Sequence, residues 1–332
     1  MNILVTGGGG FLGSHLARRL CAMGHQVTVL GRRQYKSLPE GMLSLQADLR
    51  DSQAIQKACR SRDAVFHSGA LTGIWGKKRD FEQINVDGTR NVIHGCLNHG
   101  VRTLVFTSSP SVVYGSTDME NVDESIPYPT HYLSHYPRTK ALAEQRVMAA
   151  NGKQGLRTVS LRPHLIWGPG DPHLVPRVIA RARKGQLVRV GEGKNKVDLN
   201  YIDNAVEGHI RAWQALEDGS PVDGKCYFLS DGQPVNLWDW INDLLTALNI
   251  APVTRSIPYP WARILGGMME WTYRALQMPE EPRMTRFLAG QLATSHYFNI
   301  ERARKDFNYK AVVSPEEGMK RLLSSLQAPP DG

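Results

Sequence analysis

The feature that most constrains the fold is a glycine-rich turn close to the N-terminus. Thr6-Gly7-Gly8-Gly9-Gly10-Phe11-Leu12-Gly13 spaces its glycines as G-x-x-G-x-x-G, between an apolar run, Ile3–Thr6, and a helical pattern over Phe11–Met23. In such a turn the first glycine permits the bend, the second lets backbone N–H groups approach a pyrophosphate, and the third lets helix pack closely on strand. The pattern favours a dinucleotide-binding unit over a glycine-rich turn without a ligand.

The first half of the chain alternates strand and helix patterns. Further strands are predicted at Gln26–Leu30, Ser44–Ala47, Ala64–His67, Thr103–Thr107 and Thr158–Arg162, and further helices from Asp51 to Cys59, at Phe81–Leu97 and at Tyr136–Ala150. Strands that alternate with helix-sized segments indicate a parallel sheet with helices on both faces. We therefore predict an α/β fold, a Rossmann-type doubly wound parallel sheet, with residues 1–168 as an NADP-binding domain.

Beyond residue 168 the predicted elements become shorter. Strands are predicted at Leu187–Val190, Leu199–Ile202 and Cys226–Leu229, and helices at Val175–Lys184, Asn204–Leu216, Asn236–Leu248, Ala262–Leu276 and Pro315–Leu326. They indicate a smaller C-terminal α+β portion, residues 169–332, that mostly binds substrate and returns some segments to the first domain. No flexible linker separates the two portions, so we expect them to share a cleft.

Composition excludes several other classes of protein. The net charge is +9, the mean hydropathy is −0.34, and no apolar run approaches the roughly 20 residues of a membrane-spanning helix. The four cysteines form no C-x-x-C pair, which indicates reduced thiols and no metal site. The first residues lack a signal-peptide pattern, so a cytoplasmic protein is predicted, with membrane-surface association left open. The basic charge suits an anionic cofactor, an acidic substrate or an anionic lipid surface and does not require nucleic acid.

The end of the second predicted strand bears on the choice of cofactor. An NAD site usually places Asp or Glu there to bind the ribose hydroxyls, whereas this strand ends in Gly31-Arg32-Arg33. Arg32 would attract a 2′-phosphate and Gly31 leaves room for it, so the sequence favours NADPH over NAD. The alternative is that both arginines are solvated. Asp48-Leu49 follows the third strand, where Asp48 either accepts from the adenine amine or caps a helix.

Tyr136 and Lys140 form a second chemical signal. Four residues apart on a predicted helix, they lie on one face, a turn apart. A phenol with an ordinary pKa near ~10 needs a neighbouring cation to act as acid or base near neutral pH, and Lys140 supplies one. The strand before this helix ends in Thr107-Ser108-Ser109, whose hydroxyls could hold a substrate carbonyl. Together these residues predict a catalytic centre rather than a chance Tyr-x-x-x-Lys pair.

These motifs resemble those of the extended short-chain dehydrogenases/reductases. The resemblance rests on Thr6–Gly13, Thr107–Ser109 and Tyr136-x-x-x-Lys140, and it extends to Asn85, Leu161-Arg162-Pro163, Trp167–Gly170 and Tyr201–Asn204. It implies that Ser109 bonds the substrate oxygen, with Ser108 as the competing choice. It further implies that Tyr136 transfers the proton, while Lys140 lowers the pKa of the tyrosine and orients the ribose.

The same reasoning assigns residues to the cofactor and the substrate. The expected cofactor-binding residues are Gly7, Gly10, Phe11, Leu12, Gly13, Arg32, Asp48, Leu49, Ser68, Gly69, Ala70, Thr107, Tyr136, Lys140 and Pro163. The expected substrate contacts are Ser109, Trp75 as a pocket lid, and His164 as a contact to a substrate carboxylate. The alternative for His164 is a wall residue with its hydrogen bonds satisfied.

Further segments resemble the 3β-hydroxysteroid dehydrogenase-like branch. They are Gly73–Gly76, Leu165–Asp171 and Thr285–Phe287, and Arg162-Pro163-His164 departs from the Arg-Tyr-Phe-Asn usual in nucleotide-sugar epimerases. Asp171–Arg177 and Val197–Asn204 are similar to runs in bacterial 2-alkyl-3-oxoalkanoate reductases of olefin biosynthesis. That resemblance implies an oxidoreductase of lipid metabolism that reduces a long-chain 3-oxo acid with NADPH. The alternatives are a 3β-hydroxysteroid or sterol dehydrogenase, a nucleotide-sugar epimerase or dehydratase, and a non-enzymatic NADP sensor.

The segment Pro258–Met278 has an apolar stripe at helical spacing, formed by Ile264, Met268, Trp271 and Leu276. Such a helix could line a pocket for acyl chains, lie on a lipid surface, or pack in the core. The sequence leaves these three alternatives open. It also leaves open a homodimer and association with other enzymes of a pathway.

Overall fold

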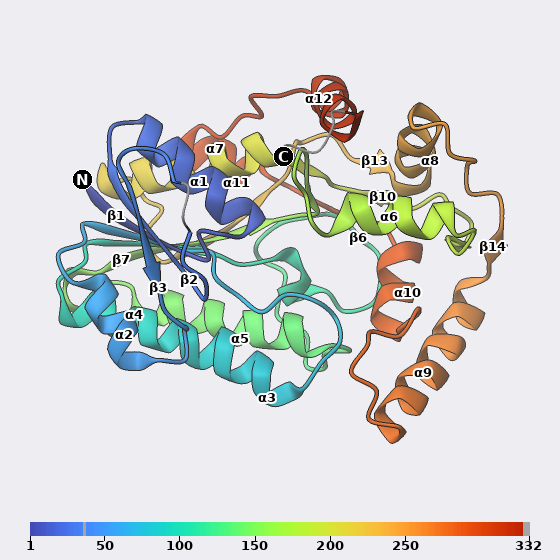
Figure 1. Ribbon diagram of the computed structural model, residues 1–332, viewed down its shortest axis with the longest axis horizontal. Coiled ribbons are helices and arrows are strands. Elements are labelled where there is room, and N and C mark those ends of the chain that lie inside the picture. The colour runs from blue at the N-terminus through green and yellow to red at the C-terminus, as the bar shows by residue number, and fades with distance from the viewer. Residues whose placement is uncertain (36–37, 328–332) are drawn as a thin grey trace.

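A seven-stranded parallel sheet forms the centre of the computed structural model, which describes residues 1–35 and 38–327 (Figure 1). The strand order is β12-β7-β5-β4-β1-β2-β3, and every neighbouring pair is parallel. The strands are β1 (Asn2–Thr6), β2 (Gln26–Gly31), β3 (Met42–Gln46), β4 (Ala64–His67), β5 (Thr103–Thr107), β7 (Arg157–Pro163) and β12 (Lys225–Leu229). The predicted Rossmann-type doubly wound sheet is confirmed.

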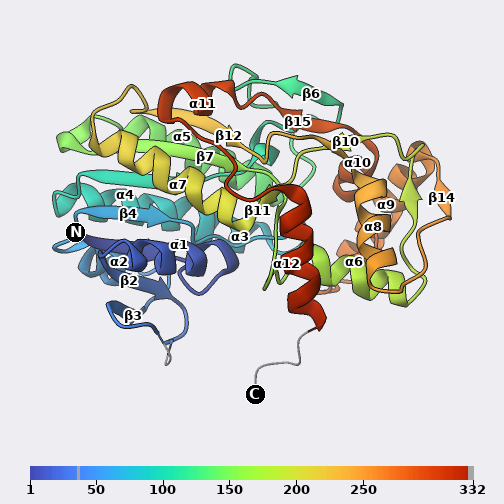
Figure 2. The ribbon, with the colours of Figure 1, turned by 90° about the horizontal axis from the view of Figure 1, so that it is seen from above.

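Helices cover both faces of this sheet. One face carries α1 (Phe11–Ala22) and α7 (Ile202–Glu217), and the other carries α2 (Ser52–Cys59), α4 (Gly88–Asn98) and α5 (His135–Ala150) (Figures 1 and 2). Because alternate residues of a strand point to opposite faces, Ile3 and Val5 of β1 pack in one core with α1, whereas Leu4 packs in the other. These two apolar layers fix the ends of the strands, where the cavity described below lies.

The helix predicted over Phe81–Leu97 is longer and irregular. Three segments run on from one another: α3 (Lys78–Phe81), the π-helical turn η1 (Glu82–Asp87) and α4. A π-helical turn inserts extra backbone into a helix, often near a functional site. Here the wider turn contains Asn85, whose buried side chain has a role in the site.

The C-terminal portion lies beyond the carboxyl ends of the central strands (Figure 1). Its small sheets are β13-β10-β15-β6, β11-β8 and β14-β9. Their strands are β6 (Met119–Val122), β8 (Ile166–Trp167), β9 (Arg189–Val190), β10 (Lys196–Val197), β11 (Asn200–Tyr201), β13 (Val235–Asn236), β14 (Ser256–Ile257) and β15 (His296–Phe298). The helices are α6 (Leu174–Arg183), α8 (Leu237–Ala247), α9 (Tyr259–Ala275), α10 (Arg286–Ala293), α11 (Glu301–Phe307) and α12 (Pro315–Gln327). Strands β6 and β8 of the small sheets come from the first 168 residues, as do the short turns η2 (Pro110–Val113) and η3 (Lys153–Gly155).

Several predictions for this portion need correction. The strand predicted at Cys226–Leu229 belongs to the central sheet as β12, because its buried apolar side chains pair with β7 rather than with the small sheets. The strands predicted at Leu187–Val190 and Leu199–Ile202 shrink to the two-residue strands β9 and β11, and Ile202 already begins α7. The elements that were not predicted are strands β6, β8, β10, β13, β14 and β15 and helices α10 and α11. Within residues 1–35 and 38–327, no helix combines the length and apolar character needed to cross a membrane.

Candidate active site

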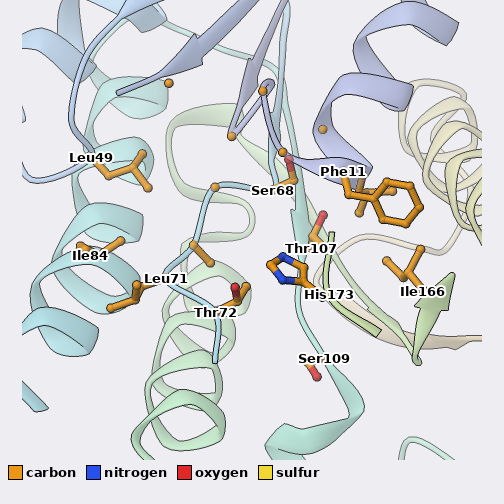
Figure 3. Close-up of a pocket in the computed structure, with 18 of the residues that line it drawn as sticks. Phe11, Leu49, Ser68, Leu71, Thr72, Ile84, Thr107, Ser109, Ile166 and His173 are labelled. Atoms are coloured by element: carbon orange, nitrogen blue, oxygen red, sulfur yellow. The ribbon is translucent and has the colours of Figure 1, made fainter. Parts of the chain in front are cut away.

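A cavity of about 910 Å³ opens at the carboxyl ends of the central strands (Figure 3). It begins at the glycine turn after β1 and passes the ends of β2, β4 and β5. From there it reaches the start of α5 and the loop after β7. In open parallel sheets, ligands bind where neighbouring strands connect in opposite directions, as β1 connects to β2 and β4 to β5 here.

The glycine turn forms one wall of the cavity and leaves no space for side chains. Gly7 has a φ of +68°, and a Cβ at this position would lie 2.6 Å from the Cα of Gly69. A Cβ on Gly13 would lie 2.2 Å from the carbonyl oxygen of Gly7. No side chain caps the N-terminus of α1 at Gly10, so the first N–H groups of the helix remain available to an anion. The turn therefore fits a pyrophosphate.

A buried network supports the turn from below. The Thr6 hydroxyl lies 2.6 Å from Nδ1 of His67, and Nε2 of His67 lies 2.9 Å from the Thr89 hydroxyl. The Ser68 hydroxyl donates to the Thr6 carbonyl at 2.8 Å, and the Gly69 N–H donates to the Thr6 hydroxyl. Burial, together with the charge of Lys140, lowers the pKa of His67 to about 3, so the imidazole is neutral. The network holds the ends of β1 and β4 together.

The end of β2 presents two cations to the cavity. Arg32 and Arg33 both line it and both are exposed. The Tyr35 hydroxyl lies so close to the turn that a Cβ on Gly9 or Gly31 would meet it at 2.0 or 2.2 Å. This wall is basic and aromatic, with a phenol over the glycine turn.

Asp48 lies beside this wall, with Leu49 opposite Phe11 in Figure 3. Arg50 binds both carboxylate oxygens of Asp48, at 3.0 and 2.7 Å, and this pairing, aided by Arg32, lowers the pKa of the carboxyl. Asp48 does not cap α2, because Asp51 accepts from the Ala54 N–H at 3.0 Å and fills that place. The helix-capping alternative for Asp48 is therefore wrong.

At the inner end of the cavity, the loop after β5 and the start of α5 bring together the side chains of Ser109, Tyr136 and Lys140. Ser109 caps the turn η2, accepting from the Ser111 N–H at 3.2 Å. The Ser109 hydroxyl lies 2.9 Å from the Ser111 hydroxyl, and it is near enough to the Tyr136 phenol to influence its pKa. Burial raises the pKa of Tyr136, and the Ser109 hydrogen bond opposes this rise. The expectation that Lys140 lowers the pKa of Tyr136 is wrong for this structure, because burial of the phenol outweighs the other influences and Lys140 is not among them. The neighbouring Ser108 hydroxyl is buried and has no hydrogen-bond partner within the described structure.

Lys140 lies one helical turn beyond Tyr136 and is 3% exposed. Its Nζ donates to the carbonyl oxygen of Thr107 at 2.5 Å and lies 4.0 Å above the ring of Phe106. Burial lowers the pKa of Lys140 to about 7. The Thr107 hydroxyl points instead to Nε2 of His209, at 2.9 Å.

Asn85, in the π-helical turn, joins three segments around this centre. Its amide donates to the Leu71 carbonyl at 3.0 Å and accepts from the Leu71 N–H at 2.7 Å. It also donates to the Thr139 hydroxyl at 3.1 Å, next to Lys140. Asn85 thus fixes the loop after β4, which lines the cavity, relative to α5.

The structure brings nearly all the predicted site residues to one cavity. The predicted residues that line it are Gly7, Gly10, Phe11, Leu12, Gly13, Arg32, Asp48, Leu49, Ser68, Gly69, Ala70, Thr107, Ser109, Tyr136, Lys140 and Pro163. Two of the predicted substrate contacts, His164 and Trp75, are absent from the lining.

His164 faces the other way. Its Nε2 lies 2.7 Å from Nδ1 of the buried His296, and burial lowers the pKa of both imidazoles. The predicted contact of His164 with substrate is therefore wrong: its hydrogen bond is satisfied, as in the alternative, but its side chain does not form a wall of this cavity. Trp75 packs edge-on against Tyr273 of α9, with ring centroids 6.2 Å apart, so it bridges the loop after β4 to α9.

Sequence reasoning missed several residues that line the cavity, including Leu71, Thr72, Ile84, Ile166 and His173, all drawn in Figure 3. Leu71 and Thr72 come from the loop after β4, Ile84 from η1, Ile166 from β8 and His173 from the loop before α6. Ile166 and His173 lie in segments that the resemblance had included, but they had been given no role in the site. His173 follows Asp171, whose carboxylate accepts from the N–H groups of His173 and Val175 at 2.7 and 2.8 Å. These hydrogen bonds of Asp171 cap the start of α6 and hold His173 at a defined place. The Asp before a predicted helix was the signal in the sequence that could have located His173.

Comparisons with known proteins agree with this geometry. The model of the 3-beta hydroxysteroid dehydrogenase/isomerase family matches residues 4–259. A 2-alkyl-3-oxoalkanoate reductase of Stenotrophomonas maltophilia is 47% identical over 331 residues, which are 99% of this chain and 100% of the relative. The human sterol-4-alpha-carboxylate 3-dehydrogenase, decarboxylating, is 34% identical over 97% of this chain and 87% of the relative.

The fold is also found in solved structures of low sequence identity. A dTDP-glucose 4,6-dehydratase double mutant from Streptomyces venezuelae, solved with NAD bound, superposes with a TM-score of 0.76. The two chains are 22% identical, with 98% of this chain and 97% of the other covered, so the likeness shows the extended short-chain dehydrogenase/reductase fold alone.

The cavity, the fold and the relatives together define an NAD(P)-dependent oxidoreductase that acts on hydroxyl or oxo groups. The chain belongs to the 3-beta hydroxysteroid dehydrogenase/isomerase family.

Proposed function

We propose that this chain is an NADPH-dependent reductase that converts a 2-alkyl-3-oxoalkanoate, a long-chain 3-oxo acid, to the 3-hydroxy acid. The observation that carries the proposal is the group of Ser109, Tyr136 and Lys140 at the inner end of a cavity that fits a dinucleotide. The substrate class is supported by the Stenotrophomonas maltophilia 2-alkyl-3-oxoalkanoate reductase, which matches this chain from end to end.

A bound nicotinamide cofactor supplies the hydride for such a reduction. The chain's own residues handle the oxygen and the proton. Ser109 and Tyr136 hydrogen-bond the carbonyl oxygen and stabilise the charge that develops on it. The raised pKa of Tyr136 keeps the phenol protonated at neutral pH, so it can donate its proton in the direction of reduction. The Lys140 ammonium then stabilises the phenolate that remains.

The cofactor preference rests on the wall at the end of β2. Arg32 and Arg33 supply cations where a 2′-phosphate would lie, and a charge-assisted hydrogen bond of this kind contributes about 1.5–3 kcal/mol. We therefore expect Arg32→Ala to weaken NADPH binding by about ten- to a hundredfold and to change NADH binding much less. Titration calorimetry with both cofactors measures this, and Arg33→Ala as a matched variant shows which arginine carries the effect. An unchanged ratio of the two affinities in Arg32→Ala would refute the assignment.

The two-part organisation is retained as a proposal. Residues 1–168 would hold the cofactor, and residues 169–332 would supply most of the substrate site while returning α7 and β12 to the sheet. In support, Asp171, His173 and Leu174 line the cavity from the second part.

The experiment that tests the function is NADPH oxidation, followed at the nicotinamide absorbance, with a racemic 2-alkyl-3-oxoalkanoate. We expect turnover in the wild type and none in Tyr136→Phe. The variant should bind NADPH nearly as well as the wild type, because it keeps the ring and loses only the hydroxyl. An equal loss of turnover and of NADPH binding in calorimetry would contradict the role given to Tyr136.

A second candidate function is oxidation of a 3β-hydroxysteroid, favoured by the 34% identical human sterol dehydrogenase. NADP⁺ reduction with such a steroid, run in parallel, separates the two. Turnover of the steroid alone would move the protein to sterol chemistry and leave the roles of Ser109, Tyr136 and Lys140 in place.

A further inference from the structure

The cavity holds one imidazole that the proposed chemistry does not use. His173 lines the cavity directly before α6, and Figure 3 shows its side chain projecting into the open space. His173 is exposed, and its ring nitrogens have no hydrogen-bond partner in the part of the chain that the structure describes. Both nitrogens are therefore available to a ligand in the cavity.

A buried cap holds this imidazole at a defined place. One carboxylate oxygen of Asp171 accepts from the N–H groups of His173 and Leu174 at 2.7 and 3.2 Å. The other oxygen accepts from the N–H group of Val175 at 2.8 Å, and Asp171 is only 7% exposed. Since both oxygens bind the backbone, Asp171 fixes the start of α6 and leaves the imidazole free. A side chain on such a rigid support can make a specific contact to a substrate.

The chain on either side of His173 gives the cavity apolar walls. Leu165 and Ile166 line it from the segment after β7, Leu174 from the start of α6, and Leu71 from the loop after β4. Such walls suit the two alkyl chains of a 2-alkyl-3-oxo acid. They offer no hydrogen bond to the carboxylate of that substrate.

Helix α9 adds nothing to these walls. Its apolar stripe, Ile264, Met268, Trp271 and Leu276, is 53% to 73% exposed, and none of these four residues lines the cavity or packs in a core. Of the three alternatives that the sequence left open for Pro258–Met278, the pocket wall and the core helix are therefore wrong for this stripe. The alkyl chains of the substrate have to lie against the walls that flank His173.

The proposed substrate carries an anion next to its reacting carbonyl. In a 3-oxo acid, a single carbon separates the carboxylate carbon from the carbonyl carbon. The carboxylate therefore enters the cavity together with the oxygen that Ser109 and Tyr136 bind. A carboxylate taken out of water without a partner is strongly disfavoured, so this end of the cavity needs a group that binds it.

The other basic residues of the cavity are placed for different tasks. Besides His173, those that line it within the described structure are Arg32, Arg33 and Lys140. Lys140 is 3% exposed, and its Nζ is already bound to the carbonyl oxygen of Thr107 at 2.5 Å. The two arginines follow β2, which lies three strands from β5, or roughly 14 Å away at the usual strand spacing. His173 is the group that remains for the carboxylate.

We propose that His173 is a specificity-determining residue that binds the carboxylate of the 3-oxo acid. An imidazole donates an N–H hydrogen bond in either protonation state, and it attracts an anion more strongly when charged. With the carboxylate on His173 and the carbonyl oxygen on Ser109 and Tyr136, the substrate is held at two points, which fixes the orientation of its carbonyl. A 3β-hydroxysteroid without a carboxylate lacks this second point. The inference rests on the proposed function, because it concerns that substrate in that site.

The test compares a 2-alkyl-3-oxoalkanoate with its methyl ester, which keeps the alkyl chains and the carbonyl and has no charge. His173→Phe retains a flat ring and loses both ring nitrogens. NADPH oxidation should show a KM for the acid that rises by about ten- to a hundredfold in this variant, as for loss of a hydrogen bond to a charged group. The KM for the ester should stay nearly unchanged, as should NADPH binding in calorimetry. Calorimetry of the 3-hydroxy acid with the NADPH complex, in which no turnover occurs, should show the same loss of affinity.

Two further variants sharpen this comparison. His173→Gln keeps an amide N–H near the place of Nε2 and should recover part of the affinity for the acid. His131→Phe is the matched control, because His131 is exposed and does not line the cavity, and it should change none of these values.

The possible outcomes separate this inference from the proposed function. If the wild type reduces the acid, and His173→Phe raises the KM for acid and ester equally or for neither, the role of His173 is refuted and the function stands. Weaker NADPH binding in His173→Phe would also refute the role, since the imidazole would then contact the cofactor. A wild type that does not reduce the acid overturns the proposed function and this inference with it.

Discussion

Replacement of Lys140 by methionine gives a quantitative test of the catalytic centre. Burial lowers the pKa of Lys140 from 10.5 to about 7. In the unfolded chain the ammonium keeps its ordinary pKa, so between these two values the unfolded state binds more protons than the folded state. The free energy of unfolding of the wild type therefore rises with pH in this window. Lys140 alone contributes a rise of about 1.4 kcal/mol for each pH unit.

The magnitude follows from the same two pKa values. Below pH 7 the buried charge costs roughly 5 kcal/mol of folding free energy, and this cost fades as the pH approaches 10.5. Lys140→Met removes the titration. Between about pH 7 and about pH 9, we expect the difference in unfolding free energy between wild type and variant to move by about 2 kcal/mol in favour of the wild type. Loss of the hydrogen bond to Thr107 changes the difference in unfolding free energy by the same amount at every pH. The slope of that difference with pH reports the ionisation of Lys140.

Urea unfolding of the cofactor-free protein at a series of pH values measures this slope. Lys57→Met, at an exposed position on α2, is the matched control, and its difference from the wild type should stay flat. A flat difference for Lys140→Met as well would mean that the pKa of Lys140 is not lowered, and the electrostatic account of the site would be wrong.

Two further substitutions test the scaffold of the site. Gly13→Ala places a Cβ 2.2 Å from the Gly7 carbonyl oxygen, so we expect a loss of about 1–3 kcal/mol in stability and of most cofactor affinity. Thermal unfolding and calorimetry measure these losses, and Gly115→Ala, with open space around it, should change neither. Glu144→Gln leaves the guanidinium of Arg162, 2% exposed, without its anion, and should cost about 3–5 kcal/mol in urea unfolding. A smaller loss in Glu144→Gln than in the exposed pair variant Glu317→Gln would contradict this assignment.

The central sheet could be predicted because its determinants are local. Each of its strands is an apolar run followed by a turn or a helical pattern, and the glycine turn identifies the first of them. Strand β15 could not be predicted in this way, since His296–Phe298 pairs with β6, far away in the sequence. Such short strands form because their partners are brought together by the rest of the fold, and their own residues carry little preference.

The contrast between local patterns and packing of distant segments also explains which site residues could be predicted. Residues in spaced motifs, such as Ser109, Tyr136 and Lys140, lie together in the cavity as expected. His164 and His173 show the limit of this reasoning, because both follow β7 and both are imidazoles. Only the packing of His164 on His296 decides that His173, and not His164, faces the cavity.

The position of β12 has a consequence for the synthesis of the chain. Strand β7 needs β12 as its outer neighbour, yet α6 and α7 lie between the two in the sequence. As the nascent chain leaves the ribosome, Arg157–Pro163 therefore emerges as an open sheet edge, with the apolar side chains of Val159 and Leu161 still lacking the cover of α7. Unpaired parallel edges of this kind pair readily with other chains. The central sheet thus becomes complete only when Lys225–Leu229 has been made, and a fragment that stops at residue 168 should aggregate rather than fold.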